Sequence, residues 1–145
     1  MTYLINLCFT TGKFPEILKE AAVVPIHKTG DKSQMINYRP IALISNIAKI
    51  FEMCLKDRIM SFVNENKLLN DNQFGFRENK STTDALAYFI DEIYNNLDKS
   101  LKSIAIFIDL AKAFDTLDHN KILVKLENIG LRGIVLSLIE SYLKK

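Results

Sequence analysis

Residues 104–109 have the sequence Ile-Ala-Ile-Phe-Ile-Asp, and this stretch decides the predicted fold. A short continuous apolar run is typical of a central β-strand buried on both faces, here over residues 103–108. The strand ends at Asp109. Because a strand fixes the residue at its exit, we expect the Asp109 carboxylate to be held rigidly at the edge of a sheet.

A β-hairpin is predicted nearer the N-terminus. Residues 22–27 are apolar and partly β-branched and include Pro25, which is typical of an edge strand. The polar stretch Thr29-Gly30-Asp31-Lys32-Ser33 predicts a turn, and residues 39–44 can return as the second strand.

Helices are predicted on both sides of this hairpin. Residues 4–9 form a short one, and Pro15 begins another with Glu16 in its first turn. Ser45 is the expected N-cap of a long helix. Apolar residues at helical spacing predict the buried face of that helix: Ile47, Ile50, Phe51, Cys54, Leu55, Ile59 and Phe62.

Later helices carry clear boundary signals. Ser81 and Asp84 match a capping box, and the helix behind them presents one apolar face: Ala85, Leu86, Phe89, Ile90, Ile93 and Leu97. A further helix over residues 121–128 is closed by Gly130, and a last one begins near Gly133. The loop at residues 68–80 contains Gly75, for which we expect a turn with positive φ. Helices and strands alternate, so the predicted class is α+β with a small mixed sheet.

The composition is that of an ordinary globular domain. The 145 residues are 48% hydrophobic and 25% charged, and the net charge of +2 does not by itself predict nucleic-acid binding. Cys8 and Cys54 lie among apolar residues, which predicts reduced buried thiols and an intracellular protein. No apolar run could span a membrane, and residues 1–9 lack the features of a signal peptide. The chain ends within a predicted helix, which indicates either a truncated reading frame or a frayed natural terminus.

Asp109 is the candidate metal ligand. Mg²⁺ prefers a few carboxylate oxygens together with substrate phosphates, and the backbone carbonyl of Leu110 could add a ligand. Strands often end in aspartate, and Asp115 and Asp118 could simply cap helices or form salt bridges. From spacing alone, a structural role is favoured for Asp109, Asp115 and Asp118. A haloacid-dehalogenase-like phosphatase also begins with an apolar strand and an aspartate, but it needs a second aspartate at position 111, which is alanine.

Three motifs, taken together, resemble the reverse transcriptases of non-LTR (LINE-type, jockey-like) retrotransposons. Residues 106–115, Ile-Phe-Ile-Asp-Leu-Ala-Lys-Ala-Phe-Asp, are similar to that family's motif A. Residues 23–31 and 37–43 resemble its fingers hairpin, and residues 72–77 with 81–85 resemble its loop and helix start. The motifs occur in the family's order. The resemblance implies a partial right-hand polymerase: a single domain over residues 1–145, with fingers at about 14–100 and the start of the palm at about 101–145.

The resemblance also implies roles for individual residues. Asp109 would be the first catalytic aspartate and would bind two Mg²⁺ ions, with Leu110 as a backbone ligand. Phe114 would be the steric gate beneath the deoxyribose, near the backbone of residues 110–113. The predicted nucleotide-binding set is Lys28, Arg39, Ala113 and Phe114, and the predicted template-binding set is Gln73, Phe74, Gly75 and Arg77.

Simpler roles remain open for several of these residues. Arg39 could pair with Asp31 or Glu52 on the surface, and Phe114 could be part of the core. His27 and His119 have no partner at metal-ligand spacing, so we interpret both as incidental polar residues.

The family's second catalytic element, an aromatic-x-Asp-Asp turn, does not occur in the 145 residues. We therefore expect a fragment of an RNA-directed DNA polymerase that has little activity alone. Its expected partners are an RNA template, a DNA primer, deoxynucleoside triphosphates and the rest of a retrotransposon polyprotein. The alternative is a non-catalytic nucleic-acid-binding remnant that uses Lys28, Arg39 and Arg77.

Overall fold

The computed structural model describes residues 1–110 and 113–144, which divide into two compact units. The first unit joins Met1–Met60 to Leu117–Lys145, and the second is Ser61–Thr116. Helix α2 (Asn46–Glu65) begins in the first unit and ends in the second. This division is one of packing, and the predicted boundary between fingers and palm stays a prediction.

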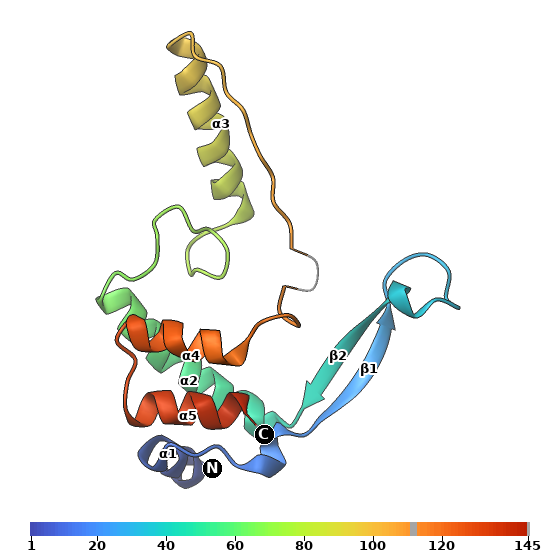
Figure 1. The fold of residues 1–145 in the computed structure, drawn as a ribbon, viewed down its shortest axis with the longest axis vertical. Coiled ribbons are helices and arrows are strands. Elements are labelled where there is room, and N and C mark those ends of the chain that lie inside the picture. The colour runs from blue at the N-terminus through green and yellow to red at the C-terminus, as the bar shows by residue number, and fades with distance from the viewer. Residues whose placement is uncertain (111–112, 145) are drawn as a thin grey trace. The chain divides into compact units, whose positions relative to one another are not determined.

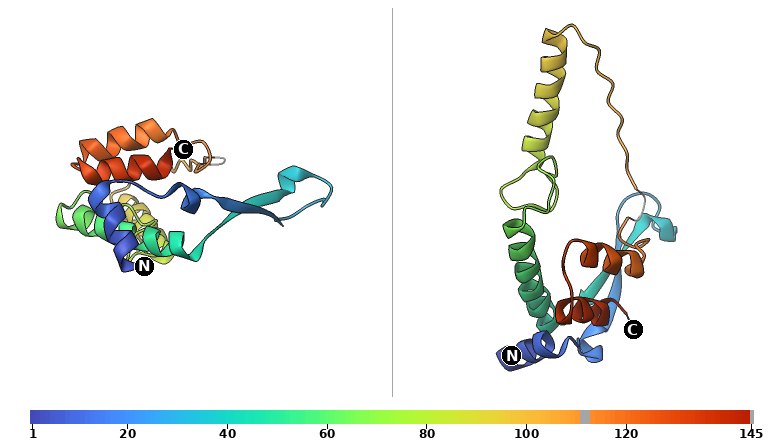
Figure 2. Two further views of the ribbon diagram at one scale, coloured as in Figure 1. Left: turned by 90° about the horizontal axis from the view of Figure 1, so that it is seen from below. Right: turned by 60° about the vertical axis from the view of Figure 1, so that its left-hand side comes forward.

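The hairpin of the first unit confirms the predicted strands. After the short 3₁₀ helix η1 (Glu16–Lys19), β1 (Ala21–His27) pairs antiparallel with β2 (Tyr38–Ile44), with a 3₁₀ turn η2 (Met35–Asn37) between them. Pro25 lies opposite Pro40, so the two residues without an N–H group face each other. Most residues of both strands are exposed, and Figures 1 and 2 show the hairpin as a long twisted ribbon. The described residues form this two-stranded antiparallel sheet alone, so the predicted mixed sheet is wrong.

The core of the first unit is built from helices. Helix α1 (Thr2–Thr11), the start of α2, and α5 (Ile134–Leu143) surround it, and α4 (His119–Asn128) packs on α5 (Figures 1 and 2). Its buried residues are Cys8, Phe14, Ala48, Phe51, Leu55, Leu138 and Ile139. Burial raises the pKa of the Cys8 thiol. Cys8 and Cys54 are both free, as predicted, but Cys54 is only half-buried, so its predicted burial is wrong.

Helix α2 begins as predicted but buries a different stripe. The Ala48 amide donates a hydrogen bond to Ser45 Oγ at 3.1 Å, which confirms Ser45 as the N-cap. Ile47 and Ile50, however, are 39% and 40% exposed, so their predicted place in the core is wrong. The small Ala48 lies in the core instead, because there the helix can approach its neighbours closely.

The ends of α1 and α5 are joined by specific contacts. Gly12 ends α1 with a φ of +68°, and a Cβ there would lie 3.2 Å from the Ile134 carbonyl oxygen. The Phe14 amide donates to Ser141 Oγ at 3.0 Å. Lys19 Nζ donates to the Lys144 carbonyl oxygen at 2.6 Å. These contacts tie the base of the hairpin to the core.

The remaining helix boundaries follow the sequence signals. Asp118 caps α4 by accepting bonds from the Asn120 and Lys121 amides, and Gly130 follows the helix with a φ of +104°. Gly133 precedes α5, as predicted. Among the described residues, no helix is both long and apolar enough to cross a membrane.

The second unit contains α3 (Thr82–Asp98), and its capping box is present as predicted. Ser81 Oγ accepts from the Asp84 amide at 3.1 Å, and the Asp84 carboxylate accepts from the Ser81 amide at 2.7 Å. The bond from the Ser81 hydroxyl is the main reason that the pKa of Asp84 is lowered. The apolar face of α3 is left largely open, since Leu86 and Leu97 are 57% and 60% exposed.

The predicted central strand is not formed. Residues 101–110 are neither helix nor strand, and Figure 1 shows them as an extended trace after α3. Ile104, Phe107 and Ile108 are 90%, 85% and 84% exposed. A buried central strand needs a neighbour on each side, and the sheet of the described residues contains only β1 and β2. The prediction of a first palm strand at residues 103–108 is therefore wrong for this structure.

Candidate nucleic-acid and nucleotide site

Asp109 lies at the end of the extended segment, where its side chain is exposed. Within the part of the chain that the structure describes, its carboxylate makes no hydrogen bond or ion pair. Leu110 is 71% exposed. The predicted contact of residues 110–113 with a triphosphate falls partly on residues 111 and 112, which lie outside the described residues. Among the described residues, the Asp109 carboxylate is thus unpaired, and no strand holds it in place.

Phe114 lies in a turn, not in the core. Its side chain is 74% exposed, and its ring meets that of Phe76 edge-on, with centroids 6.1 Å apart and an interplanar angle of 86°. Ala113, before it, is partly buried. The simpler role of Phe114 as a core residue is therefore excluded in this structure, and its ring is accessible to a ligand.

Lys28 and Arg39 lie on the hairpin of the first unit. Arg39 is opposite Ile26 in the β1–β2 register, and both cationic side chains are exposed. Among the described residues the ion pairs are Lys19–Glu16 and Lys144–Glu140, so Arg39 pairs with neither Asp31 nor Glu52. Both cations are available to bind an anion.

The tip of the hairpin is ordered by its own hydrogen bonds. The Lys28 amide donates to the Asn37 carbonyl oxygen at 2.8 Å, and Asn37 Nδ2 donates to the Asp31 carbonyl oxygen at 2.9 Å. The Ser33 amide donates to Asp31 Oδ1 and lowers the pKa of that carboxyl. Gly30 has a φ of +87°, and a Cβ there would lie 2.7 Å from Asn37 Nδ2. These contacts fix the backbone on which Lys28 is carried.

His27 has local structural contacts. His27 Nε2 lies 3.0 Å from the Gly30 carbonyl oxygen, and its ring packs edge-on against Tyr38. No group of three His, Cys, Asp or Glu side chains in the described ranges could hold a metal ion.

The predicted template-binding residues lie in one loop of the second unit. Gln73 Nε2 donates to the Gly75 carbonyl oxygen at 3.2 Å, and Arg77 Nη1 donates to the Asn70 carbonyl oxygen at 2.9 Å. Gly75 does not have a positive φ, so that prediction is wrong; the left-handed residue is Phe76, with a φ of +59°.

Sequence reasoning missed two neighbours of Phe74. Its ring lies 5.8 Å from that of Tyr88, and the Lys80 ammonium is 4.8 Å from its centroid. Tyr88 follows Ser81 by two helical turns, which places it on the N-terminal part of α3 next to the loop. Helical spacing counted from the capping box could have found it.

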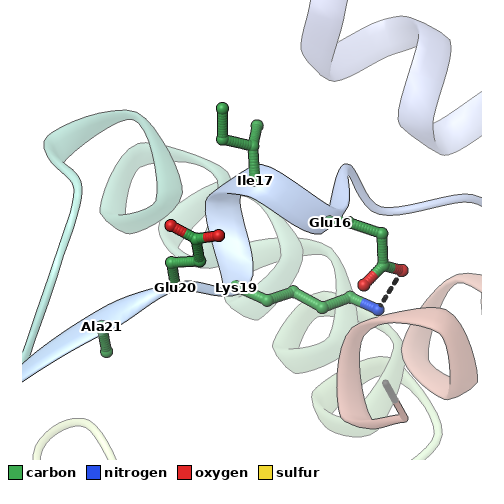
Figure 3. Close-up of a pocket in the computed structure, with 5 residues that line it drawn as sticks. All are labelled: Glu16, Ile17, Lys19, Glu20 and Ala21. Carbon is green, nitrogen blue, oxygen red and sulfur yellow. Dashed lines mark hydrogen bonds and ion pairs between the residues drawn. The ribbon is translucent and has the colours of Figure 1, made fainter.

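The structure therefore places the predicted residues in two groups. Asp109, Phe114 and the loop of predicted template-binding residues belong to the second unit, and Lys28 and Arg39 belong to the first. A pocket at the base of the hairpin contains none of them. It is lined by Glu16, Ile17, Lys19, Glu20 and Ala21 (Figure 3). In this pocket the Lys19 ammonium forms an ion pair with Glu16 at 2.6 Å, so its charge is already balanced by a protein group.

Comparison with known proteins agrees with the motifs. The model of the reverse transcriptase (RNA-dependent DNA polymerase) family matches residues 26–145. The probable RNA-directed DNA polymerase from transposon BS of Drosophila melanogaster is 32% identical over 89% of this chain and 14% of its own length. The probable RNA-directed DNA polymerase from transposon X-element of the same species is 29% identical over 99% of this chain and 16% of its own length.

A third relative is the RNA-directed DNA polymerase from mobile element jockey of Drosophila melanogaster, 27% identical over 89% of this chain. The chain spans between 14% and 16% of the length of these three relatives. No solved structure matches the chain significantly. Because the family model covers most of the sequence, the chain belongs to the reverse transcriptase family and carries part of a LINE-type reverse transcriptase domain.

Proposed function

We propose that this chain is the part of a retrotransposon RNA-directed DNA polymerase that carries the first catalytic aspartate and the nucleotide-binding hairpin. The observation that carries the proposal is the family match over residues 26–145, which includes the end of β1, all of β2, the predicted template-binding loop and Asp109. Its proposed partners are an RNA template, a DNA primer and deoxynucleoside triphosphates. The other polymerase elements would come from the rest of a retrotransposon polyprotein, which would work inside the cell.

Asp109 is the proposed ligand of the catalytic Mg²⁺ ions. Its free carboxylate oxygens and the Leu110 carbonyl are hard ligands of the kind that Mg²⁺ prefers. The described residues fit only one side of such a site, since they contain no cluster of three metal-binding side chains. In the complete enzyme two Mg²⁺ ions would supply Lewis-acid activation of the phosphoryl group. The remaining carboxylates would lie outside this sequence, so we expect negligible polymerisation by these residues alone.

Four residues are the proposed nucleotide ligands: Lys28, Arg39, Ala113 and Phe114. Among the described residues the Arg39 guanidinium has no ion-pair partner, so it can hold phosphate oxygens through two parallel bonds, and Lys28 adds a point charge. Phe114 has an exposed ring that can pack beneath a deoxyribose, where a 2′-hydroxyl would have no room. The backbone of Ala113 would approach the triphosphate beside it.

Primer extension tests this proposal. In a protein that carries this segment within a complete reverse transcriptase domain, Asp109→Ala should abolish Mg²⁺-dependent extension on an RNA template. RNA binding, measured in parallel, should be unchanged. The matched control is Asp118→Asn, because asparagine caps a helix as well as aspartate does. Equal extension by the Asp109→Ala variant and the unmodified protein would refute the catalytic role and favour a binding module.

A further inference from the structure

Phe76 is the most unusual residue of the template-binding loop. Its side chain is 90% exposed, and its φ of +59° lies in the left-handed region. For a bulky aromatic residue this conformation is strained. A strained and solvated ring is unfavourable for folding, and packing among the described residues does not explain it.

The other phenylalanine of the loop has a different environment. The Phe74 ring is held between Tyr88, at 5.8 Å, and the Lys80 ammonium, at 4.8 Å. Lys80 also donates to the Asp71 carbonyl oxygen at 3.3 Å. The Phe74 ring thus packs against protein groups and anchors the loop, whereas the exposed Phe76 ring is accessible to a ligand.

Gly75, between the two phenylalanines, has no side chain to cover the backbone. Gly75 does not use the left-handed conformation that glycine allows, and a Cβ added to it would meet no described atom within 4 Å. Neither the local conformation nor crowding within the chain therefore requires a glycine. A bare backbone beside an exposed ring allows a planar ligand to approach closely.

The surroundings of the ring favour an anionic strand that carries bases. Arg77 follows Phe76 directly, and among the described residues only its Nη1 is bonded, to the Asn70 carbonyl oxygen. Arg77 also lines a pocket with Lys67 and Asp71. A cation next to an exposed aromatic ring is the arrangement that binds single-stranded nucleic acid, through phosphate contact and base stacking.

We propose that Phe76 is a stacking platform for a base of a single RNA strand, that Gly75 provides the clearance for it, and that Phe74 is the anchor of the loop. This inference rests on the proposed function, which supplies RNA as the ligand. The edge-on contact of Phe76 with Phe114 places the platform beside the proposed sugar gate.

The test uses the full 145-residue chain and a single-stranded RNA of about 12 nucleotides that contains 2-aminopurine, whose fluorescence is quenched on stacking. Phe76→Asn should weaken binding roughly 5- to 100-fold and abolish the quenching. Phe76→Trp should retain both. Tyr94→Ala is the control, because Tyr94 is an exposed aromatic residue, at 63%, on α3 of the same unit. This variant should bind as the unmodified chain does.

The urea midpoint separates a binding role from a structural one. Asparagine accepts the left-handed conformation more easily than phenylalanine, so Phe76→Asn should unfold at the same or a higher urea concentration. A lower midpoint together with weaker binding would show that Phe76 is structural, and would overturn the proposal.

Two further results would also overturn it. If Phe76→Asn binds the RNA normally while Arg77→Gln does not, base stacking on Phe76 is excluded, although the loop still binds RNA. If the unmodified chain does not bind the RNA, the platform fails as well. The proposed polymerase function would then be judged separately, by primer extension with Asp109→Ala.

Discussion

Replacing Phe51 with alanine removes a ring from the centre of the first unit's core. Phe51 is 2% exposed, and its ring centroid lies 5.5 Å from that of Phe9 and 4.8 Å from that of Phe14. A buried phenylalanine removes roughly 150–250 Å² from water, which at about 25 cal/mol per Å² gives roughly 4–6 kcal/mol. This is an upper bound, and measured Phe→Ala changes in cores cost about 3–5 kcal/mol. We expect a loss of about 3–5 kcal/mol in the free energy of unfolding.

Urea unfolding followed by circular dichroism measures this loss. The matched control is Ile50→Ala at the neighbouring position, which is 40% exposed and should cost less than about 1 kcal/mol. If the alanine variant is unfolded without urea, Phe51→Leu should show a smaller loss of about 1 kcal/mol. Equal losses in Phe51→Ala and Ile50→Ala would refute the assignment of Phe51 to the core.

Four other changes test separate parts of the structure and of the proposed site. Ser81→Ala should cost about 1 kcal/mol and fray the start of α3, as amide exchange would show. Hydrogen bonds from Ser81 lower the pKa of Asp84 from 3.8, so the charged carboxylate stabilises the fold above pH 3.8. This contribution to stability should be lost as the pH falls through the folded-state pKa of Asp84. Circular dichroism should show the loss of helix in the unmodified chain and not in Asp84→Asn. Burial and the bond to Glu52 raise the pKa of Tyr142 from 10.0 to about 12. The contribution of Tyr142 to stability should therefore be fully present below pH 10 and be lost between pH 10 and about 12, and urea titrations of Tyr142→Phe should lack this part of the pH dependence. In a complete enzyme, Phe114→Val should admit ribonucleotides during primer extension, and an unchanged preference for deoxyribonucleotides would exclude its role as the sugar gate.

Local signals in the sequence predicted local structure well. The capping box at Ser81 and the N-cap at Ser45 act within one helical turn, so their residues alone specify them. Capping was one of two structural roles left open for Asp118, and the structure shows that it caps α4. Pro25 limited its strand to a sheet edge, and β1 is an edge strand. Gly130 was identified from its position after a helix, and its φ is positive.

Features that depend on distant residues were predicted less well. Five apolar residues in a row favour a central strand, but a strand forms only where neighbours supply hydrogen bonds, and residues 104–108 have none among the described residues. On α2, helical spacing could not show that Ala48 is in the core and Ile50 at its edge, because the positions of α1 and α5 decide this.

The candidate site was predicted mainly through its likeness to a family. Nothing in the residue types separates Phe74 from Phe76, since their difference lies in a backbone angle and in the neighbours Tyr88 and Lys80. Likewise, a positive φ was predicted for Gly75, but the residue that has it is Phe76. Glycine has this conformation most often, but here the neighbouring phenylalanine adopts it.

The central claim is that Asp109 binds the catalytic metal of a reverse transcriptase, and directed cleavage tests it most directly. Fe²⁺ would replace Mg²⁺ in a protein that carries this segment within a complete domain, bound to an RNA template and DNA primer. Hydroxyl radicals made at the metal should then cut the backbone beside Asp109, and excess Mg²⁺ or Asp109→Asn should suppress the cut. A cleavage pattern that avoids this segment, or that is the same in Asp109→Asn, would contradict the claim.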